Sequence, residues 1–190
     1  MKVKPSPKRG RVVVELDRKD AGLMAGFETA ANGRSAFRLK KILVPVDFSD
    51  CSRKALEYAV SFGKQFGATL LLVHVVEIHY GGALYGPVDF PNLERDFLED
   101  SENRLSALAK EIRGRGVKVE TQSVPGRAAS RIAEMAGRTD ADLILLATHG
   151  YTGLKHVFLG STTEQVVRYA PCPVLVVREK EHDFLETDPA

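Results

Sequence analysis

The sequence has 190 residues, of which 44% are hydrophobic and 27% are charged. These fractions are typical of globular proteins and exclude collagen-like, disordered and low-complexity chains. No apolar run approaches the roughly 20 residues that a membrane span needs, and the N-terminal residues show no signal-peptide core. We therefore expect a cytoplasmic protein with no membrane segment.

Charge is unevenly distributed along the chain. Residues 1–41 contain 11 Lys and Arg against 4 Asp and Glu, so the rest of the chain is acidic. We interpret residues 1–40 as a basic, poorly ordered extension with a short strand at Arg11 to Leu16. The extension lacks aromatic residues interleaved with its basic ones, which disfavours a nucleic-acid-binding arm. Residues 179–190 contain five acidic residues and one lysine and are interpreted as an acidic tail.

Between these extensions, residues 41–178 alternate short apolar runs with longer stretches of helical period. The runs are mostly continuous, as in strands that are buried on both faces. This alternation predicts an α/β fold with an open five-stranded parallel sheet and helices on both faces. The five expected strands are Ile42–Val46, Thr69–Val76, Val117–Val124, Leu143–Ala147 and Val174–Val177.

Four helices are expected between these strands. The first is predicted over residues 50–66, with Ser49 or Asp50 as its N-cap, and the second over residues 93–113. Residues 77–91 are rich in glycine, which predicts a long flexible connection before the second helix. The third helix is expected after Gly126 and the fourth after Gly160. The residues expected to face the sheet from the second and fourth helices are Phe97, Leu105, Leu108, Ile112, Val166 and Val167.

Ligands of open α/β sheets bind beyond the carboxyl ends of the strands, where the strand order reverses. There the fourth strand leads into ATHGYTGLKHVFLGSTTEQ, a glycine-punctuated loop followed by a helix start with three hydroxyls. Glycines let a backbone approach a ligand closely, and a helix N-terminus attracts phosphate, so the segment predicts an anion site. The alternative is that Gly150 and Gly153 only shape a turn and that Ser161 or Thr162 only caps the helix.

Two common nucleotide-binding classes are disfavoured by their missing motifs. No Gly-Lys-Ser/Thr ending is present, which argues against a P-loop NTPase. The first strand leads into VPVDFSD rather than GxGxxG, which argues against an NAD-type dehydrogenase. Asp47 ends that strand, where its carboxylate can accept hydrogen bonds from ribose hydroxyls or cap the following turn. Cys51 and Cys172 show no metal-ligand spacing, so no metal site is assigned.

Two histidines fall near the expected site. His74 lies inside a buried-type strand and is interpreted as a hydrogen-bonded core imidazole. His149 lies in the glycine loop, where it either approaches phosphate or stabilises the turn. Neither has an acid–base partner in the sequence. We therefore expect a binding protein rather than an enzyme, with any ATP hydrolysis slow and incidental.

Four segments together resemble the universal stress protein family in order and spacing: VPVDFSD, LLLVHVV, VPGRAASRI and ATHGYTGLKHVFLGSTTEQVVRYAPCPVLVVR. The last resembles the family's nucleotide signature, Gly-x2-Gly-x9-Gly-Ser/Thr, with Gly150 as the second glycine and Gly160-Ser161 as the end. Ala147 occupies the position of the first glycine. Its methyl group is expected either to crowd the nucleotide and weaken binding or to replace one apolar contact.

The resemblance implies which residues hold the nucleotide. Asp47 would bind the ribose, the backbone of Val75 would read adenine, and Gly126 would lie beside the pocket. The glycine loop and the start of the last helix would hold the phosphates. The full set of implied nucleotide-binding residues is Pro45, Val46, Asp47, Val75, Gly126, Leu146, Ala147, His149, Gly150, Gly160, Ser161, Thr162 and Thr163.

The resemblance further implies a Rossmann-like fold of the adenine-nucleotide α-hydrolase type and a stress-response regulator. Its ligand would be ATP or another adenine nucleotide, with any Mg²⁺ arriving on the nucleotide. A homodimer is implied through the edge strand Pro173 to Arg178. The alternative is a dimeric interaction module of the same fold that binds no nucleotide. A nucleotide hydrolase or AMP-forming enzyme is disfavoured, because no glycine-serine phosphate loop follows the first strand.

Overall fold

The computed structural model describes residues 2–5, 12–15, 38–78, 90–148 and 160–178. The chain divides into two units, Met1–Arg38 and Leu39–Ala190. In the first unit, β1 (Lys2–Pro5) pairs with β2 (Val12–Glu15) in an antiparallel ladder. The strand expected near residue 12 is thus present, whereas β1 was not expected. The acidic tail and most of the glycine-rich connection lie outside the described residues.

The second unit contains a five-stranded parallel sheet of order β5-β4-β3-β6-β7. This confirms the predicted open sheet, and each strand lies within one residue of its predicted ends. The central run Ile42, Leu43 and Val44 is completely buried, as expected for a strand covered on both faces. The strands are β3 (Lys41–Pro45), β4 (Thr69–Val76), β5 (Lys118–Pro125), β6 (Leu143–Ala147) and β7 (Val174–Val177).

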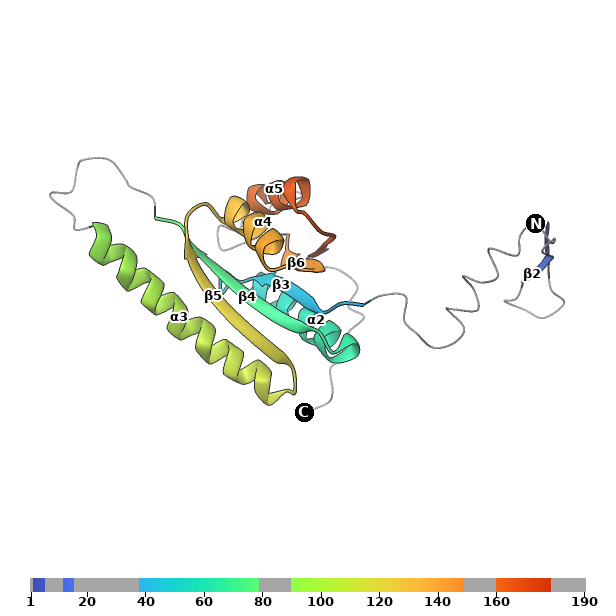
Figure 1. Cartoon of the computed structure of the whole chain (residues 1–190), viewed down its shortest axis with the longest axis horizontal. Coiled ribbons are helices and arrows are strands. Elements are labelled where there is room, and N and C mark those ends of the chain that lie inside the picture. Colours follow the sequence, from blue (N-terminus) through green and yellow to red (C-terminus); the bar gives the residue numbers. More distant parts are fainter. Residues whose placement is uncertain (1, 6–11, 16–37, 79–89, 149–159, 179–190) are drawn as a thin grey trace. The chain divides into compact units, whose positions relative to one another are not determined.

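Helices cover both faces of the sheet (Figure 1). Ile42 and Val44 pack with α2 and α3, whereas Leu43 points to the opposite face and packs with α4 and α5. This alternation divides the apolar core into two layers, one on each side of the sheet. The helices are α2 (Asp50–Phe66), α3 (Phe90–Gly114), α4 (Ala128–Arg138) and α5 (Ser161–Tyr169).

The ends of α2 follow directly from its sequence. Ser49 is the N-cap, and its hydroxyl accepts a hydrogen bond from the Ser52 amide at 3.2 Å. Gly67 ends the helix in the left-handed region at φ 66°, where glycine carries no steric cost. Between these caps the helix buries an apolar stripe against the sheet. The helix therefore holds the carboxyl end of β3 and the turn after it in a defined position.

Two residues predicted to face the sheet are instead exposed. Phe97 is 49% exposed, because the buried stripe of α3 begins only at Ser101 and the earlier turns project past the sheet (Figure 1). Val167 is also 49% exposed. Its neighbour Val166 is completely buried, and successive helical residues lie about 100° apart, so the short helix α5 turns only one of them inward. These two predictions are wrong.

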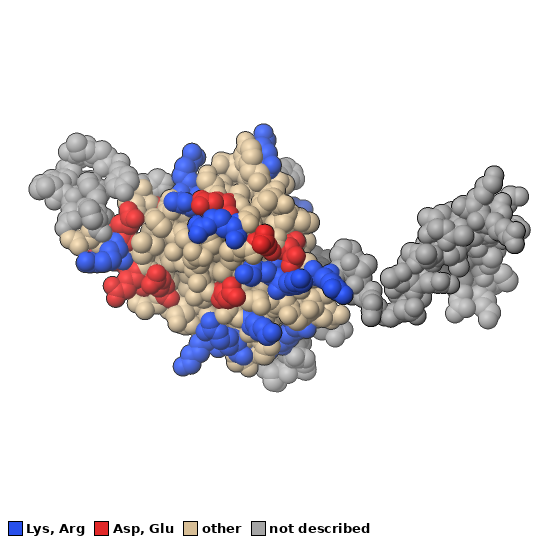
Figure 2. Space-filling model, viewed as in Figure 1, with Lys and Arg blue, Asp and Glu red and all other residues tan. Residues whose placement is uncertain are grey.

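Acidic and basic side chains are interspersed on the face of the chain that Figure 2 shows. One ion pair links α2 to the turn after α3, where Arg115 donates two hydrogen bonds to the carboxylate of Glu57 at 2.7 and 2.8 Å. These bonds lower the pKa of Glu57. Both side chains are partly exposed, so the pair stabilises the fold by at most about 1 kcal/mol. None of the helices in the described ranges is both long and apolar enough to cross a membrane.

Candidate functional site

The strand order reverses between β3 and β6, which lie side by side at the centre of the sheet. A cavity of about 180 Å³, here called the strand-end cavity, lies at the carboxyl ends of these strands. This is the position where open α/β sheets bind ligands. The cavity is lined by Pro45, Val46, Asp47, Ser52, Val73, His74, Val75, Ala128, Ile132, Leu146, Ala147, Gly160, Ser161, Thr162 and Thr163.

Ten of the residues implied by the resemblance line this cavity, and they come from four separate segments of the chain. Gly126 lines an adjoining cavity instead. His149 and Gly150 lie outside the described residues. Sequence reasoning missed five lining residues, of which Ala128 and Ile132 come from α4. These two residues are four positions apart and therefore lie on one face of the helix. The tertiary packing decides which strands have their ends against that face.

Asp47 forms a tight turn at the end of β3. One carboxylate oxygen accepts hydrogen bonds from the Ser49 amide at 3.0 Å and from the Ser49 hydroxyl at 2.6 Å. Phe48, between them, adopts φ 63°, which is unfavourable for a bulky side chain and is often found at functional sites. The turn-capping role that the sequence left open is therefore present. The turn also fixes the carboxylate at the cavity wall.

His74 supports the same turn from the neighbouring strand. Its Nδ1 lies 2.6 Å from the carbonyl oxygen of Val46, and since a carbonyl can only accept, Nδ1 donates. The imidazole also packs against Phe48, with 4.8 Å between ring centroids. The guanidinium of Arg104 also lies over the Phe48 ring, 3.8 Å from its centroid. The predicted hydrogen-bonded role of His74 is confirmed, although the residue is only half-buried.

The start of α5 forms the opposite wall of the strand-end cavity. Gly160 is the N-cap and has no side chain with which to accept hydrogen bonds from the first amides of the helix. The Thr163 hydroxyl donates to the Ala147 carbonyl at 2.9 Å, which ties the helix to the end of β6. The exposed Ser161 and half-buried Thr162 complete the wall. This arrangement can present backbone amides and two hydroxyls to an anion.

The start of α4 differs, because a carboxylate from the sheet caps it. The side chain of Glu77, just after β4, accepts a hydrogen bond from the amide of Ala128. An acid at a helix N-terminus is favourable and occupies the place that an external anion would take. Of these two helix starts, α5 is therefore the better candidate for binding phosphate.

Ala147 does not fill the strand-end cavity. The residue is half-buried and forms part of the wall, and the cavity remains open with its methyl group in place. Its carbonyl is held by Thr163, so the backbone at this position is fixed by α5. Space for a ligand is therefore present despite the missing glycine.

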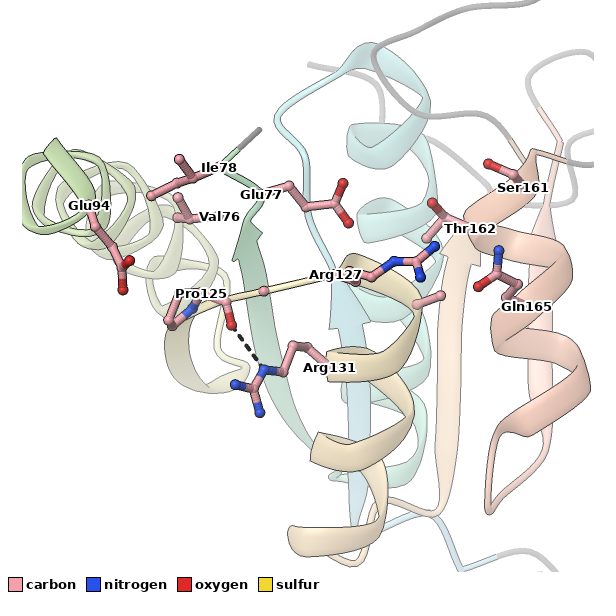
Figure 3. Close-up of a pocket in the computed structure, with 12 residues that line it drawn as sticks. Val76, Glu77, Ile78, Glu94, Pro125, Arg127, Arg131, Ser161, Thr162 and Gln165 are labelled. Atoms are coloured by element: carbon pink, nitrogen blue, oxygen red, sulfur yellow. Dashed lines mark hydrogen bonds between the residues drawn. The ribbon is translucent and has the colours of Figure 1, made fainter. Parts of the chain in front are cut away.

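A second cavity of about 560 Å³, here called the outer cavity, adjoins the first (Figure 3). Ser161 and Thr162 line both cavities, so the two meet at the start of α5. The remaining wall of the outer cavity is more polar and includes both acidic and basic side chains. It is formed by Val76, Glu77, Ile78, Glu94, Pro125, Gly126, Arg127, Ala129, Arg131 and Gln165.

A sequence profile described as the universal stress protein family matches residues 38–178. The chain belongs to the universal stress protein family. A universal stress protein of Methanocaldococcus jannaschii, MJ0531, is 34% identical over 152 residues, which cover 80% of this chain and 88% of that protein. The family resemblance drawn from the four sequence segments is thereby confirmed.

Solved structures of the family share the fold. The structure of MJ0577, from the same archaeon, superposes with a TM-score of 0.66 at 29% identity and covers 77% of this chain and 100% of its own. A universal stress protein from Archaeoglobus fulgidus, solved in complex with dAMP, gives a TM-score of 0.52. It is 22% identical and covers 74% of this chain and 98% of its own, which establishes a common fold.

Proposed function

We propose that this universal stress protein binds an adenine nucleotide in the strand-end cavity and acts as a stress-response regulatory module. The observation that carries the proposal is that four segments implied by the family resemblance converge on one cavity at the switch point of the sheet. The A. fulgidus protein of the same fold, solved with dAMP, supports an adenine nucleotide as the ligand class.

Each wall of the strand-end cavity has a role in the proposed complex. The carboxylate of Asp47 accepts hydrogen bonds from the ribose hydroxyls, and the backbone of Val75 contacts adenine. Ser161, Thr162 and the first amides of α5 bind phosphate. The apolar strand ends between these groups exclude water from the base. The site therefore combines an apolar interior with a few polar groups that orient the ligand.

Mg²⁺ enters the proposed complex on the nucleotide. Within the described ranges, no group of three His, Cys, Asp or Glu side chains is placed to hold a metal ion. Mg²⁺ prefers a few carboxylates together with substrate phosphates, so ATP would supply most of its ligands. The ion would then reduce the charge of the phosphates beside α5.

The proposed regulatory role assigns structural contacts to the titratable side chains of the strand-end cavity. The titratable side chains that line the strand-end cavity in the described part of the chain are Asp47 and His74. One Asp47 oxygen holds the Ser49 turn, and His74 Nδ1 donates to the Val46 carbonyl. Both side chains thus hold the turn after β3, and this structural role supports a binding site in the proposal.

Titration calorimetry of ligand-free protein with Mg-ATP tests the proposal. We expect saturable binding for the natural sequence and an affinity about tenfold lower for Asp47→Asn, since an amide replaces a charge-assisted acceptor. Asn still accepts the Ser49 hydrogen bonds, so the turn is retained. The exposed Asp50→Asn removes the same charge three residues away and should leave the affinity unchanged. Absence of saturable binding by the natural sequence contradicts the proposed function.

A second candidate is the interaction module that binds no nucleotide, and the edge of the sheet favours it. Among the described strands, β7 pairs only with β6. The carbonyls of Pro173 and Val177 accept hydrogen bonds from the amides of Ile144 and Thr148, so the alternate residues Val174 and Val176 turn their backbone groups to the other side. A second copy could pair there. Sedimentation as a dimer at micromolar concentration supports this assembly, and sedimentation as a monomer contradicts it.

A further inference from the structure

Two arginines line the outer cavity, and they differ in their contacts with the described residues. Arg131 donates to the Pro125 carbonyl at 2.9 Å and to Glu134 at 2.7 Å. Arg127 makes no side-chain hydrogen bond or ion pair with any residue in the described ranges, and its side chain is exposed. Figure 3 shows its guanidinium directed toward Thr162 and Gln165 of α5. A cation is thus positioned where the two cavities meet.

The turn that carries Arg127 is fixed by its neighbours. Gly126 adopts φ 128°, a conformation that side chains rarely tolerate, and its amide donates to the Val76 carbonyl at 3.1 Å. A Cβ atom at Gly126 would lie 2.9 Å from Nε of Arg131. Arg131 in turn holds the carbonyl of Pro125. The backbone of Arg127 is therefore held between β5 and α4, so its side chain is presented to the cavity from a defined position.

The two acidic residues of the outer cavity differ in position, since Glu77 extends toward Arg127 whereas Glu94 lies on the far side (Figure 3). Glu77 accepts the amide of Ala128, and the positive end of the α4 dipole offsets part of its charge. Glu94 comes from α3, across the cavity from Ser161 and Thr162 (Figure 3). The α5 side of the cavity therefore combines a guanidinium, two hydroxyls and a helix N-terminus.

We propose that the outer cavity receives the β- and γ-phosphates of the nucleotide and that Arg127 makes the site favour polyphosphates over monophosphates. This inference rests on the proposed function. The strand-end cavity, at about 180 Å³, is smaller than the roughly 300–1,000 Å³ of most ligand sites, so a whole nucleotide would extend beyond it. An α-phosphate beside Ser161 and Thr162 then lies at the border of the two cavities. Further phosphates extend toward Arg127, whose planar fork suits bidentate phosphate binding.

Affinities for AMP, ADP and ATP, measured by calorimetry in the same excess of Mg²⁺, test the role of Arg127. We expect the natural sequence to bind ATP at least about tenfold more tightly than AMP. Arg127→Gln should weaken ATP binding by about tenfold or more and AMP binding by less than about twofold, because AMP does not reach the guanidinium. Arg138→Gln removes an exposed arginine at the other end of α4 and should change neither affinity.

Several outcomes overturn the inference. Equal losses of affinity for AMP and ATP in Arg127→Gln would show that Arg127 does not contact the β- and γ-phosphates. Unchanged ATP affinity in this variant would show the same. Equal affinities of the natural sequence for AMP and ATP would do the same. If the natural sequence binds no adenine nucleotide, the proposed function fails as well. Thermal unfolding of Arg127→Gln, expected to match that of Arg138→Gln, confirms that the comparison concerns folded proteins.

Discussion

Leu105→Ala is expected to lower the free energy of unfolding by about 2–5 kcal/mol, the largest stability effect among the changes considered. Leu105 is completely buried and lies in the core layer between α3 and the sheet. Its replacement by alanine removes apolar contacts and leaves a cavity that the surrounding side chains fill only in part. Urea unfolding followed by circular dichroism measures the change.

Phe97→Ala provides the matched control on the same helix. Phe97 is 49% exposed and lies two turns before Leu105, so its truncation should cost less than about 1 kcal/mol. If Phe97→Ala destabilises the protein as much as Leu105→Ala, then the first turns of α3 are covered in solution. That result would contradict the packing described for this helix.

Gly160→Val is expected to weaken ATP binding by at least about tenfold. Gly160 lines the strand-end cavity, so a branched side chain there takes space from the ligand and separates it from the first amides of α5. The backbone at this position has φ −63° and ψ 149°, which valine also adopts, so the fold is retained. Valine is a poorer N-cap than glycine, and we expect a stability loss of about 1 kcal/mol. Titration calorimetry with Mg-ATP measures the affinity.

Gly114→Val is the control for this change. An added Cβ atom at Gly114 meets nothing within 4 Å, and the residue lies at the end of α3, outside both cavities. Its ATP affinity should equal that of the natural sequence. Unchanged ATP affinity in Gly160→Val would show that the start of α5 is not part of the binding site. The phosphates would then have to bind elsewhere.

The sheet and the helix ends could be predicted because local signals determine them. Strands buried on both faces need continuous apolar runs, and Ile42 to Val44 provide one. Ser49 and Gly67 mark the two ends of α2 through their own hydrogen bonding and backbone conformation. Most of the candidate site could also be located, since parallel strands bring their carboxyl ends to one edge of the sheet.

The remaining features depend on tertiary packing and could not be derived from local pattern. Phe97 follows the helical period of the buried stripe, but its exposure depends on where the sheet ends. The positive φ of Phe48 arises from the Asp47 turn and the ring contact with His74, which join two strands. The position of Arg127 depends on the turn between β5 and α4 and on α5 lying opposite. In each case the deciding contact joins segments that are distant in the sequence.

The melting temperature of ligand-free protein, measured with Mg-ATP and with Mg-GTP at the same concentration, tests adenine-nucleotide binding most directly. A ligand at about 100 times its dissociation constant stabilises the folded state by about 2.7 kcal/mol. For a chain of this size, each kcal/mol raises the melting temperature by roughly 2–4 °C. We predict a rise of about 5–10 °C with Mg-ATP and little change with Mg-GTP. Equal melting temperatures with and without Mg-ATP would contradict nucleotide binding and leave the dimeric interaction module as the better account.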